Sequence, residues 1–494
     1  MNKTLIFLLL LPFALLAQPG TVNMTPVQSG NLQSTNIIVP SKFSTVFPAG
    51  KSLKIPQGHG VKVFYAGGLS KPRFLCFDAS GVLHVADQTN GAIYAMPDKN
   101  NDGIADTMYI AASGFKDSHD VKFYKGAMYV TDSIRVWKCM DANADGIYES
   151  RSIFIDSIGF GAAKGGHHTR TIVFDSLNHK VYLSIGSSCN VCRENQKAII
   201  EQYNEDGTGK RTYASGIRNA VGMTLHPVTN RLWANNNGSD LQGNEIPPEW
   251  INIIRDGGFY GHPFAYGNQV WFNFNAHANY QALLPITSAD SINVKKMIEP
   301  AALVRAHSAP MASTFLNNGF PSQYKNGRLT ALRGSWNSPQ SFRGYKVVYL
   351  DLSSATDTTI NYVSDFVDGF LTDTINRVYW GRPVGLAVDG SGGIYLSSDE
   401  TNKFILKIFP LFPNGINKHQ IEEFNLIPNP AKNTLRIVGV PFPTSKDYSI
   451  LNLQGQTLIT GELNSNETEI NISNLSSGLY LFKIGETIKK FLKE

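Results

Sequence analysis

The chain of 494 residues contains no block of lysine and arginine, and its net charge of +5 is small for this length. This charge pattern argues against nucleic acid as a partner. After the first 17 residues, no segment is long and apolar enough to be a transmembrane segment. Helical periodicity is scarce, whereas glycine is frequent, with 44 residues. This composition favours many short strands joined by turns.

Cysteine is also scarce, and of the four cysteines only Cys189 and Cys192 share a C-x-x-C spacing. The next residue is Arg193, where covalent haem attachment needs a histidine. A zinc site would need a second pair, and Cys76 and Cys139 are too isolated to supply it. The sequence therefore predicts a local disulfide between Cys189 and Cys192 that braces a loop. Cys76 and Cys139 are expected to be buried in strands.

The N-terminus has the pattern of a signal peptide, predicted for residues 1–17. Lys3 provides the positive end, Leu5 to Leu16 the apolar run, and Ala17 the small residue for cleavage. Residues 18–50 are rich in Thr, Ser, Pro, Gln and Asn and hold few large apolar side chains. We therefore expect a flexible lead there.

One pattern recurs along the chain: an apolar strand, a tight turn and a second apolar strand. The first four copies start about 50 residues apart, which is the period of a propeller blade. Each copy supplies two inner strands of a four-stranded blade, and the blades must close into a ring to bury their faces. We predict an all-β fold with a six-bladed β-propeller over residues 51–410. The copies start at Pro72, Asp120, Thr171, Val221, Ala312 and Pro383.

The gap before the fifth copy holds a predicted insertion, roughly residues 262–300, which is expected on the ligand face of the ring. Residues 411–423 form a predicted linker. Residues 424–494 alternate short strands with Gly and Asn turns, as in a small Ig-like β-sandwich. The alternative for this tail, an ordinary accessory Ig-like module, predicts the same fold.

The tail resembles the C-terminal sorting domain of type IX secretion. The resemblance is carried by Pro428-Asn429-Pro430, by the Gly455 turn and by the segment from Leu475 to Tyr480. It implies recognition by the secretion machinery and export through the periplasm and outer membrane. The chain is then secreted or held at the cell surface.

Charged residues stand just before the innermost strand in four of the six copies. Loops at one end of a propeller converge on its central channel, so these residues predict one shared site. Arginine forks suit a ligand with several carboxylates or carbonyl oxygens. The loop from Asn235 to Asp240, with Glu245, offers oxygens of the kind that Ca²⁺ accepts. The polar and charged residues at these positions are His167, Arg218 with Asn219, Arg305 with His307, and Arg382.

The ring resembles the soluble glucose/sorbosone dehydrogenase family, whose members use pyrroloquinoline quinone (PQQ), and its sorbosone branch in particular. The resemblance implies a dehydrogenase that oxidises a sugar or a sugar-derived aldehyde. It also implies PQQ and Ca²⁺ as cofactors and a separate external electron acceptor. The matching segments, in order, are 165–171, 187–192, 216–219, 237–240, 245–249, 257–263, 306–310, 334–337 and 381–384.

The same resemblance assigns roles to individual residues. His167 matches the general base, and counting back from Ile172 selects it over its neighbour His168. Arg218 and Asn219 match the pair that contacts quinone and substrate oxygens. The Gly238 and Ser239 carbonyls match the turn that holds the calcium bound to PQQ. Asp240 and Glu245, from the oxygen-rich loop described above, complete the predicted calcium ligands. Further residues expected at the cofactor are Arg305, His307, Arg333, Trp336 and Arg382. Relatives carry His at the position of Arg333.

Two other loops share the pattern D-x-N-x-D-G-x-x-[D/E]. This spacing places alternate oxygens around one point, as structural calcium loops require. Neither loop has flanking helical patterns, and a tight Asp/Asn/Gly turn explains the same residues. Both alternatives stay open. The oxygens belong to Asp98, Asn100, Asp102 and Asp106 in the first loop, and to Asp141, Asn143, Asp145 and Glu149 in the second.

Two competing functions follow from the same residues. One is a non-catalytic propeller that is displayed at the surface and binds a glycan or a protein, since propellers host many functions. The other is a metal-dependent lactone hydrolase. That activity needs a carboxylate-rich centre, whereas the candidate residues are mostly arginine and histidine.

Overall fold

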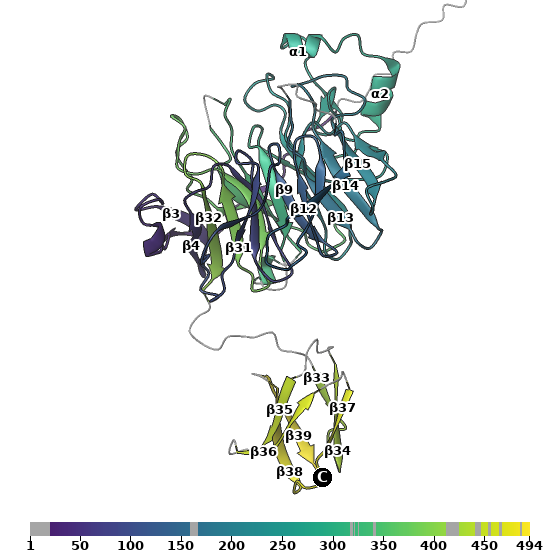
Figure 1. The fold of residues 1–494 in the computed structure, drawn as a ribbon. Helices are drawn as coiled ribbons and strands as arrows, with labels where there is room; N and C mark the ends of the chain where they lie inside the picture. The colour runs from purple at the N-terminus through teal and green to yellow at the C-terminus, as the bar shows by residue number, and fades with distance from the viewer. Residues whose placement is uncertain are drawn as a thin grey trace, which may run out of the picture. The chain divides into compact units, whose positions relative to one another are not determined.

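The structure is a computed structural model, and it divides the chain into two compact units, residues 1–411 and 412–494, each described by itself. Strands dominate both units, so the predicted all-β class is confirmed (Figure 1). The predicted signal peptide and linker residues 412–423 lie outside the described residues. The described residues are 20–158, 166–316, 320, 322–324, 326–338, 342–411, 424–439, 446–452, 456–463, 467–484 and 487–494.

Six sheets of four or five strands make up most of the described part of the first unit. Each contains one predicted strand pair. The first holds β5 (Pro72–Phe77), β6 (Leu83–Asp87), β7 (Ala92–Met96) and β8 (Tyr109–Ser113), and the second β9 (Asp120–Tyr124), β10 (Ala127–Thr131), β11 (Val136–Met140) and β12 (Ser150–Ile155). The third holds β13 (Ile172–Asp175), β14 (Lys180–Ile185), β15 (Ile199–Asn204), β16 (Arg211–Ser215) and β20 (Gly258–Phe259).

The other three sheets follow the same plan. The fourth holds β17 (Ala220–Leu225), β18 (Leu232–Asn236), β19 (Glu249–Ile253) and β23 (Ala302–Val304). The fifth holds β24 (Pro310–Phe315), β25 (Arg328–Leu332), β26 (Lys346–Leu350), β27 (Val363–Val367) and β1 (Val27–Gln28). The sixth holds β30 (Pro383–Val388), β31 (Ile394–Ser398), β32 (Phe404–Pro410) and β4 (His59–Ala66).

The first strands of the six sheets close into a ring. In chain order β5, β9, β13, β17, β24 and β30 each contact the next, and β30 contacts β5. The N-terminal strand β4 pairs with β32 as the last strand of the sixth sheet, so both ends of the ring's chain meet in one sheet. Every position of β6 and of β31 is buried. This burial is expected where each sheet packs between two others.

The structure corrects the prediction of a flexible lead at residues 18–50. From residue 20 onward this segment runs along the ring, with β1 beside β27 and β2 (Leu32–Asn36) paired to β3 (Ser52–Pro56). A 3-10 turn, η1 (Ser41–Phe43), follows, and Phe43 and Phe47 are buried in the ring's core. The polar composition hid this arrangement because backbone groups, rather than side chains, make the strand pairings.

Replacing Phe47 by Ala is expected to lower the free energy of unfolding by about 3–5 kcal/mol. Its ring is 4% exposed and lies 5.3 Å from the Phe404 ring and 6.2 Å from the Trp380 ring, between centroids. Val46→Ala is the control, because Val46 is exposed and its loss should cost less than about 0.5 kcal/mol. Denaturant unfolding of the full chain measures both. Equal stability of the two variants would contradict a structural role for this segment.

The predicted insertion forms a cap of short elements beside the third and fourth sheets. Figure 1 shows its helices α1 (Ala278–Gln281) and α2 (Ser288–Lys295) beyond the strand ends on one side of the ring. Thr287 and Asp290 form a capping box that begins α2. None of the helices in the described ranges is long and apolar enough to cross a membrane. The remaining short elements of the first unit are β21 (Ala265–Tyr266), β22 (Val270–Trp271), η2 (Ser322–Tyr324), β28 (Leu371–Asp373) and β29 (Val378–Tyr379).

The second unit contains two sheets around one small core. Leu435, Ile450, Phe482 and Phe491 are fully buried in it, and they come from both sheets. One sheet holds β33 (Phe424–Ile427), β34 (Thr434–Gly439) and β37 (Glu467–Asn471). The other holds β36 (Thr457–Leu463), β35 (Lys446–Leu451), β38 (Gly478–Ile484) and β39 (Thr487–Lys493).

Candidate functional site

His167 lies just before β13, at the end of the ring where the innermost strands begin. Its Nδ1 lies 2.8 Å from the Ser187 carbonyl oxygen, which can only accept, so Nδ1 carries the proton and Nε2 is the basic nitrogen. Burial and the positive charge of Arg218 lower the pKa of His167 to about 3. The imidazole is therefore neutral near pH 7 and can accept a proton.

Arg218 lies just before β17, is buried, and donates from all three guanidinium nitrogens. Nε donates to the Asn190 carbonyl at 2.9 Å, and Nη1 donates to the carbonyls of Gly238 at 2.6 Å and Asn237 at 3.3 Å. Nη2 lies 3.0 Å from Asn190 Oδ1 and 3.3 Å from Asp240 Oδ2. Two turn carbonyls and a carboxylate thus converge on one cation. This is the set of oxygen donors that calcium takes in proteins.

Asp240 connects this group to the fifth sheet. Its Oδ1 accepts from Asn337 Nδ2 at 2.5 Å and lies 3.5 Å from His307 Nδ1. The other ring nitrogen of His307 lies 3.0 Å from the Gly243 carbonyl oxygen. Burial opposes a charge on His307, but its hydrogen bonds to Asp240 and Gly243 raise its pKa. Residues that precede three different sheets therefore meet here, as the sequence predicted for His167, Arg218 and His307.

Asn219 and His167 lie close together over Gly186. A Cβ built on Gly186 would lie 2.5 Å from His167 Cβ and 2.8 Å from Asn219 Oδ1, so only glycine leaves room for both side chains. The turn at Gly238 and Ser239 is held from two other elements. The Gly238 N–H donates to the buried carboxyl of Glu249, and Ser239 Oγ accepts from Tyr280 OH of the cap at 2.8 Å.

Arg333 and Arg382, predicted to hold the cofactor's carboxylates, are paired with carboxylates of the chain itself. Arg333 Nε lies 2.9 Å from Asp399 Oδ1, and its Nη2 lies 2.7 Å from Glu400 Oε2. Arg382 Nη1 lies 2.8 Å from the same Glu400 oxygen, and Arg73 pairs with Asp399. Three guanidinium groups face two carboxylates, so the cluster keeps an excess of positive charge.

Glu400→Gln is expected to make the stability of the protein less dependent on pH in acid. Burial opposes ionisation, but the Tyr379 hydroxyl and the guanidinium groups of Arg382 and Arg333 lower the pKa of Glu400 to about 2, from 4.5. A carboxyl with a lowered pKa stabilises the fold above its unfolded pKa, and this contribution is lost as the pH falls towards 2. Because the side chain is 41% exposed, solvent screening limits the contribution to about 1 kcal/mol.

The measurement is the free energy of unfolding of wild type and Glu400→Gln at about pH 5 and about pH 3. Wild type should lose more stability than the variant over this range. An identical loss in both proteins would contradict the ion-pair account of this cluster.

Besides Arg333 and Arg382, the group around Arg218 also lacks the predicted residues Glu245, Arg305 and Trp336. Glu245 was expected among the calcium ligands, but its oxygens lie 2.8 and 2.9 Å from Arg343 and 3.3 Å from Arg305. The Glu245 side chain is 63% exposed, so these guanidinium groups hold it at the surface. Trp336 was expected to line the pocket and is 67% exposed.

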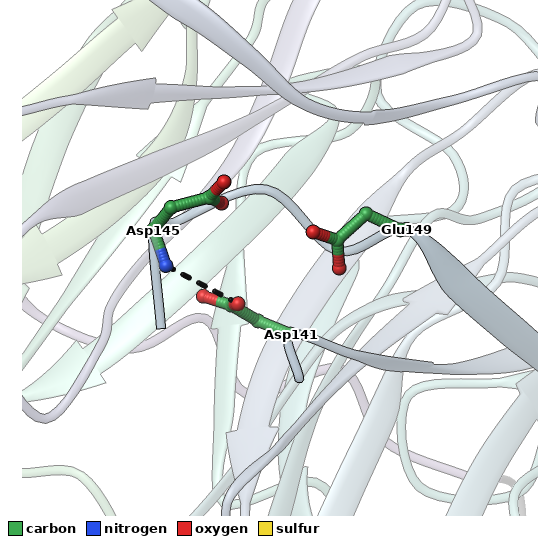
Figure 2. A group of neighbouring side chains, drawn as sticks. All are labelled: Asp141, Asp145 and Glu149. Atoms are coloured by element: carbon green, nitrogen blue, oxygen red, sulfur yellow. Dashed lines mark hydrogen bonds between the residues drawn. The ribbon is translucent and has the colours of Figure 1, made fainter. Parts of the chain in front are cut away.

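The two D-x-N-x-D-G loops are both closed by hydrogen bonds from backbone N–H groups to aspartate. Gly103 N donates to Asp98 Oδ2 and Gly146 N to Asp141 Oδ2, each at 2.8 Å. In the second loop, oxygens of Asp141, Asp145 and Glu149 also lie within 4.8 Å of one another, and Figure 2 shows these three side chains with the hydrogen bond from the Asp145 N–H to Asp141. The turn chemistry accounts for both loops without a metal, and structural calcium there stays a prediction.

Sequence reasoning missed several residues that hold the site. Asn190, Asn337 and Tyr280 each hydrogen-bond Asp240. Asn190 and Asn337 lie in loops and Tyr280 in helix α1, and the three are far apart in the chain. The sequence signals were the C-x-x-C spacing around Asn190 and the family-like segments 187–192 and 334–337, which contain Asn190 and Asn337 but gave them no role. The predicted disulfide between Cys189 and Cys192 is present, and Cys139 is buried in β11 as expected, whereas Cys76 in β5 is half-buried.

Comparison with known families identifies both units. Residues 53–407 match the family described as TrAA12-like. The chain belongs to this family. It is a family of PQQ-dependent sugar dehydrogenases, so the resemblance of the ring to such enzymes is confirmed, and its place in the sorbosone branch stays a prediction. Residues 425–494 match the secretion system C-terminal sorting domain, which confirms the resemblance of the tail and indicates export to the outside or to the cell surface.

Two solved structures share the fold of the TrAA12-like ring, and a further protein is similar to it in sequence. The AA12 enzyme of Trichoderma reesei is 19% identical with a TM-score of 0.60, covering 72% of this chain and 97% of that one. The PQQ domain of pyranose dehydrogenase from Coprinopsis cinerea is 19% identical with a TM-score of 0.59, covering 76% and 100%. An uncharacterised protein of Borreliella burgdorferi is 28% identical over 363 residues, which is 71% of this chain and 89% of that protein.

Proposed function

We propose that the protein is an exported quinoprotein dehydrogenase that oxidises a sugar or a sugar-derived aldehyde with PQQ and Ca²⁺. The six sheets are then the six blades of the propeller, and the second unit is an Ig-like sorting domain. The observation that carries the proposal is the convergence of His167, Arg218 and the turn at Gly238 at one end of the ring. A neutral base, a buried fork of donors and a set of oxygen ligands are the three parts that this reaction needs.

The donor set fits both cofactors. Calcium prefers several oxygen ligands, including backbone carbonyls and carboxylates, and Asn237, Gly238 and Asp240 already direct such oxygens at the single cationic group of Arg218. PQQ is an acid with several carboxylates, and the excess guanidinium among Arg73, Arg333 and Arg382 supplies complementary charge. Calcium binding must share the carbonyls that Arg218 now contacts.

When bound, PQQ supplies the hydride acceptor, and Ca²⁺ polarises it as a Lewis acid. The chain supplies the rest. His167 Nε2 accepts the proton of the substrate hydroxyl while the carbon loses a hydride, so the alcohol or aldehyde hydrate gives up two electrons. Arg218 donates hydrogen bonds to an oxygen that gains negative charge, with the Nη1 hydrogens that bond the Asn237 and Gly238 carbonyls until calcium takes those carbonyls. The Ser187 carbonyl keeps the His167 ring in the tautomer that this step requires.

The test is dye reduction by the purified chain after addition of PQQ and Ca²⁺, with a panel of aldoses and sorbosone-like aldehydes. The account expects turnover that requires both additions and one or more of these sugars. Absence of turnover with every substrate, together with absence of PQQ binding, would overturn it.

The second candidate is a surface-displayed propeller that binds a glycan or a protein without catalysis. It is favoured by one observation: Arg333 and Arg382 are already paired with Asp399 and Glu400, as in a structural cluster. The same assay separates the two functions, because this candidate predicts glycan or protein binding that does not depend on PQQ.

A further inference from the structure

The segment from Ser187 to Glu194, which follows β14, contacts the base and the arginine of the candidate site. The Ser187 carbonyl accepts from two nitrogens of His167, Nδ1 at 2.8 Å and the backbone N at 2.9 Å. The Ser187 N–H donates to the Arg218 carbonyl at 2.7 Å. One residue therefore fixes the distance between the two groups.

Asn190, in the same segment, holds the arginine and the turn together. Its carbonyl accepts from Arg218 Nε at 2.9 Å, and its Oδ1 accepts from Arg218 Nη2 at 3.0 Å and from the Asp240 N–H at 2.8 Å. Its Nδ2 donates to the Asp240 carbonyl at 3.0 Å. An amide side chain offers the acceptor on one atom and the donor on another, and both are used here. Asn190 thus sets the position of Arg218 relative to the turn from Asn237 to Asp240.

The chain on both sides of Asn190 is fixed. The Cys189–Cys192 disulfide closes a loop around Asn190 and Val191, and Val191 is buried in the core of the cap. On the N-terminal side, the Glu194 carboxylate accepts from the Ser188 N–H at 3.0 Å and from the Ser187 hydroxyl at 2.6 Å. On the C-terminal side, Arg193 pairs with Asp290 at 2.8 Å.

We propose that Asn190 is a positioning residue for cofactor binding and that the Cys189–Cys192 disulfide is the brace that holds it in place. This inference rests on the proposed function, because Arg218 and the turn at Gly238 are its PQQ and calcium site. Groups that orient the ligands of a cofactor metal typically contribute about 10–100-fold to affinity or activity. Asn190 is expected to contribute on this scale without touching substrate.

The first experiment is a PQQ titration at fixed Ca²⁺, followed by tryptophan fluorescence, of the full-length wild type and three variants. Asn190→Ala should raise the Kd for PQQ about 10–100-fold. Asn190→Asp keeps the acceptor oxygens, so its Kd for PQQ should rise less than that of Asn190→Ala. Asn361→Ala is the control, because Asn361 also donates two side-chain hydrogen bonds, at 2.8 and 2.7 Å, in a loop of the fifth sheet. Asn361→Ala should bind PQQ with the Kd of wild type. Its melting temperature shows how much stability the protein loses when an exposed asparagine with two hydrogen bonds is removed.

The second experiment needs no cofactor. The Asp240 N–H is bonded to Asn190 Oδ1, so amide hydrogen exchange in the peptide that contains residues 237–240 should become about tenfold faster or more in Asn190→Ala. The doubly substituted Cys189→Ser, Cys192→Ser chain should show the same change and also weaker PQQ binding. A peptide covering β31 is the internal reference, and its exchange should not change.

The outcomes separate this proposal from the proposed function. If wild type binds no PQQ, the proposed function fails, and faster exchange at residues 237–240 still supports the role of Asn190 in positioning the turn. If wild type binds PQQ, and Asn190→Ala matches it in Kd and in exchange, the positioning role is overturned and the function stands. If the double serine variant alone behaves as wild type, the disulfide is not the brace.

Discussion

His167→Gln lowers kcat for sugar oxidation by about 10²–10⁴-fold, the usual contribution of a general base. The imidazole is neutral, its Nδ1 proton is committed to Ser187, and Nε2 is the base. Glutamine keeps a polar side chain of similar length and removes the basic nitrogen. Steady-state dye reduction with saturating PQQ and Ca²⁺ measures the effect. The melting temperature of the variant shows that the fold is intact.

His168→Gln is the matched control, because it changes the neighbouring histidine, and its kcat should stay within about threefold of wild type. The reverse result, with His168 essential and His167 dispensable, would show that the register predicted from Ile172 is wrong. The low pKa of His167, about 3, adds a second expectation: kcat/KM of wild type has no acid limb from His167 above about pH 4.

Arg218→Met is expected to lower kcat/KM by about 10²–10³-fold, the cost of losing one preorganised donor to a developing charge. It also leaves the carbonyls of Asn190 and Gly238 without their guanidinium donor and Asp240 without its cation. Each buried acceptor that loses its partner costs about 1–3 kcal/mol. Arg218→Met should therefore unfold at a lower temperature than His167→Gln.

Arg218→Lys should recover little activity, because an ammonium group cannot reproduce a fork that donates to several oxygens. The control is Arg211→Lys, which changes an exposed arginine bound to Asp256 at 2.6 and 2.7 Å and should leave kcat/KM unchanged. Near-wild-type activity of Arg218→Lys would show that charge alone, rather than the geometry of the fork, is required.

The strand pairs of the ring could be predicted from the sequence, because the two strands and the turn of each pair are neighbours along the chain. Each predicted pair is found, for instance β5 with β6 at Pro72–Phe77 and Leu83–Asp87. The same locality explains the error at residues 18–50. Strands β1 and β2 of this segment pair with β27 and β3 through backbone groups. The amino-acid composition of the segment does not indicate that an unpaired strand edge lies nearby in the fold.

Sequence analysis predicted the site residues that hold the same position in successive repeats, because equivalent positions of the repeats lie at the same end of the ring. His167 and Arg218 precede innermost strands, so the repeat places them at one end of the ring. Asn190, in a loop, and Tyr280, in helix α1, reach the same point, and no periodic pattern of the sequence predicts this. Arg382 was predicted at the correct end of the ring. Its ion pair with Glu400 was not predicted, because Glu400 lies in another loop.

The central claim is that one end of the ring binds PQQ together with Ca²⁺. Its most direct test is an absorption titration of the purified full-length chain with PQQ, with Ca²⁺ present and after chelation. The account predicts saturable binding of one PQQ per chain that is lost on chelation, and that Arg218→Met weakens strongly. Absence of binding in every calcium condition, or binding of equal strength in wild type and Arg218→Met, would contradict it.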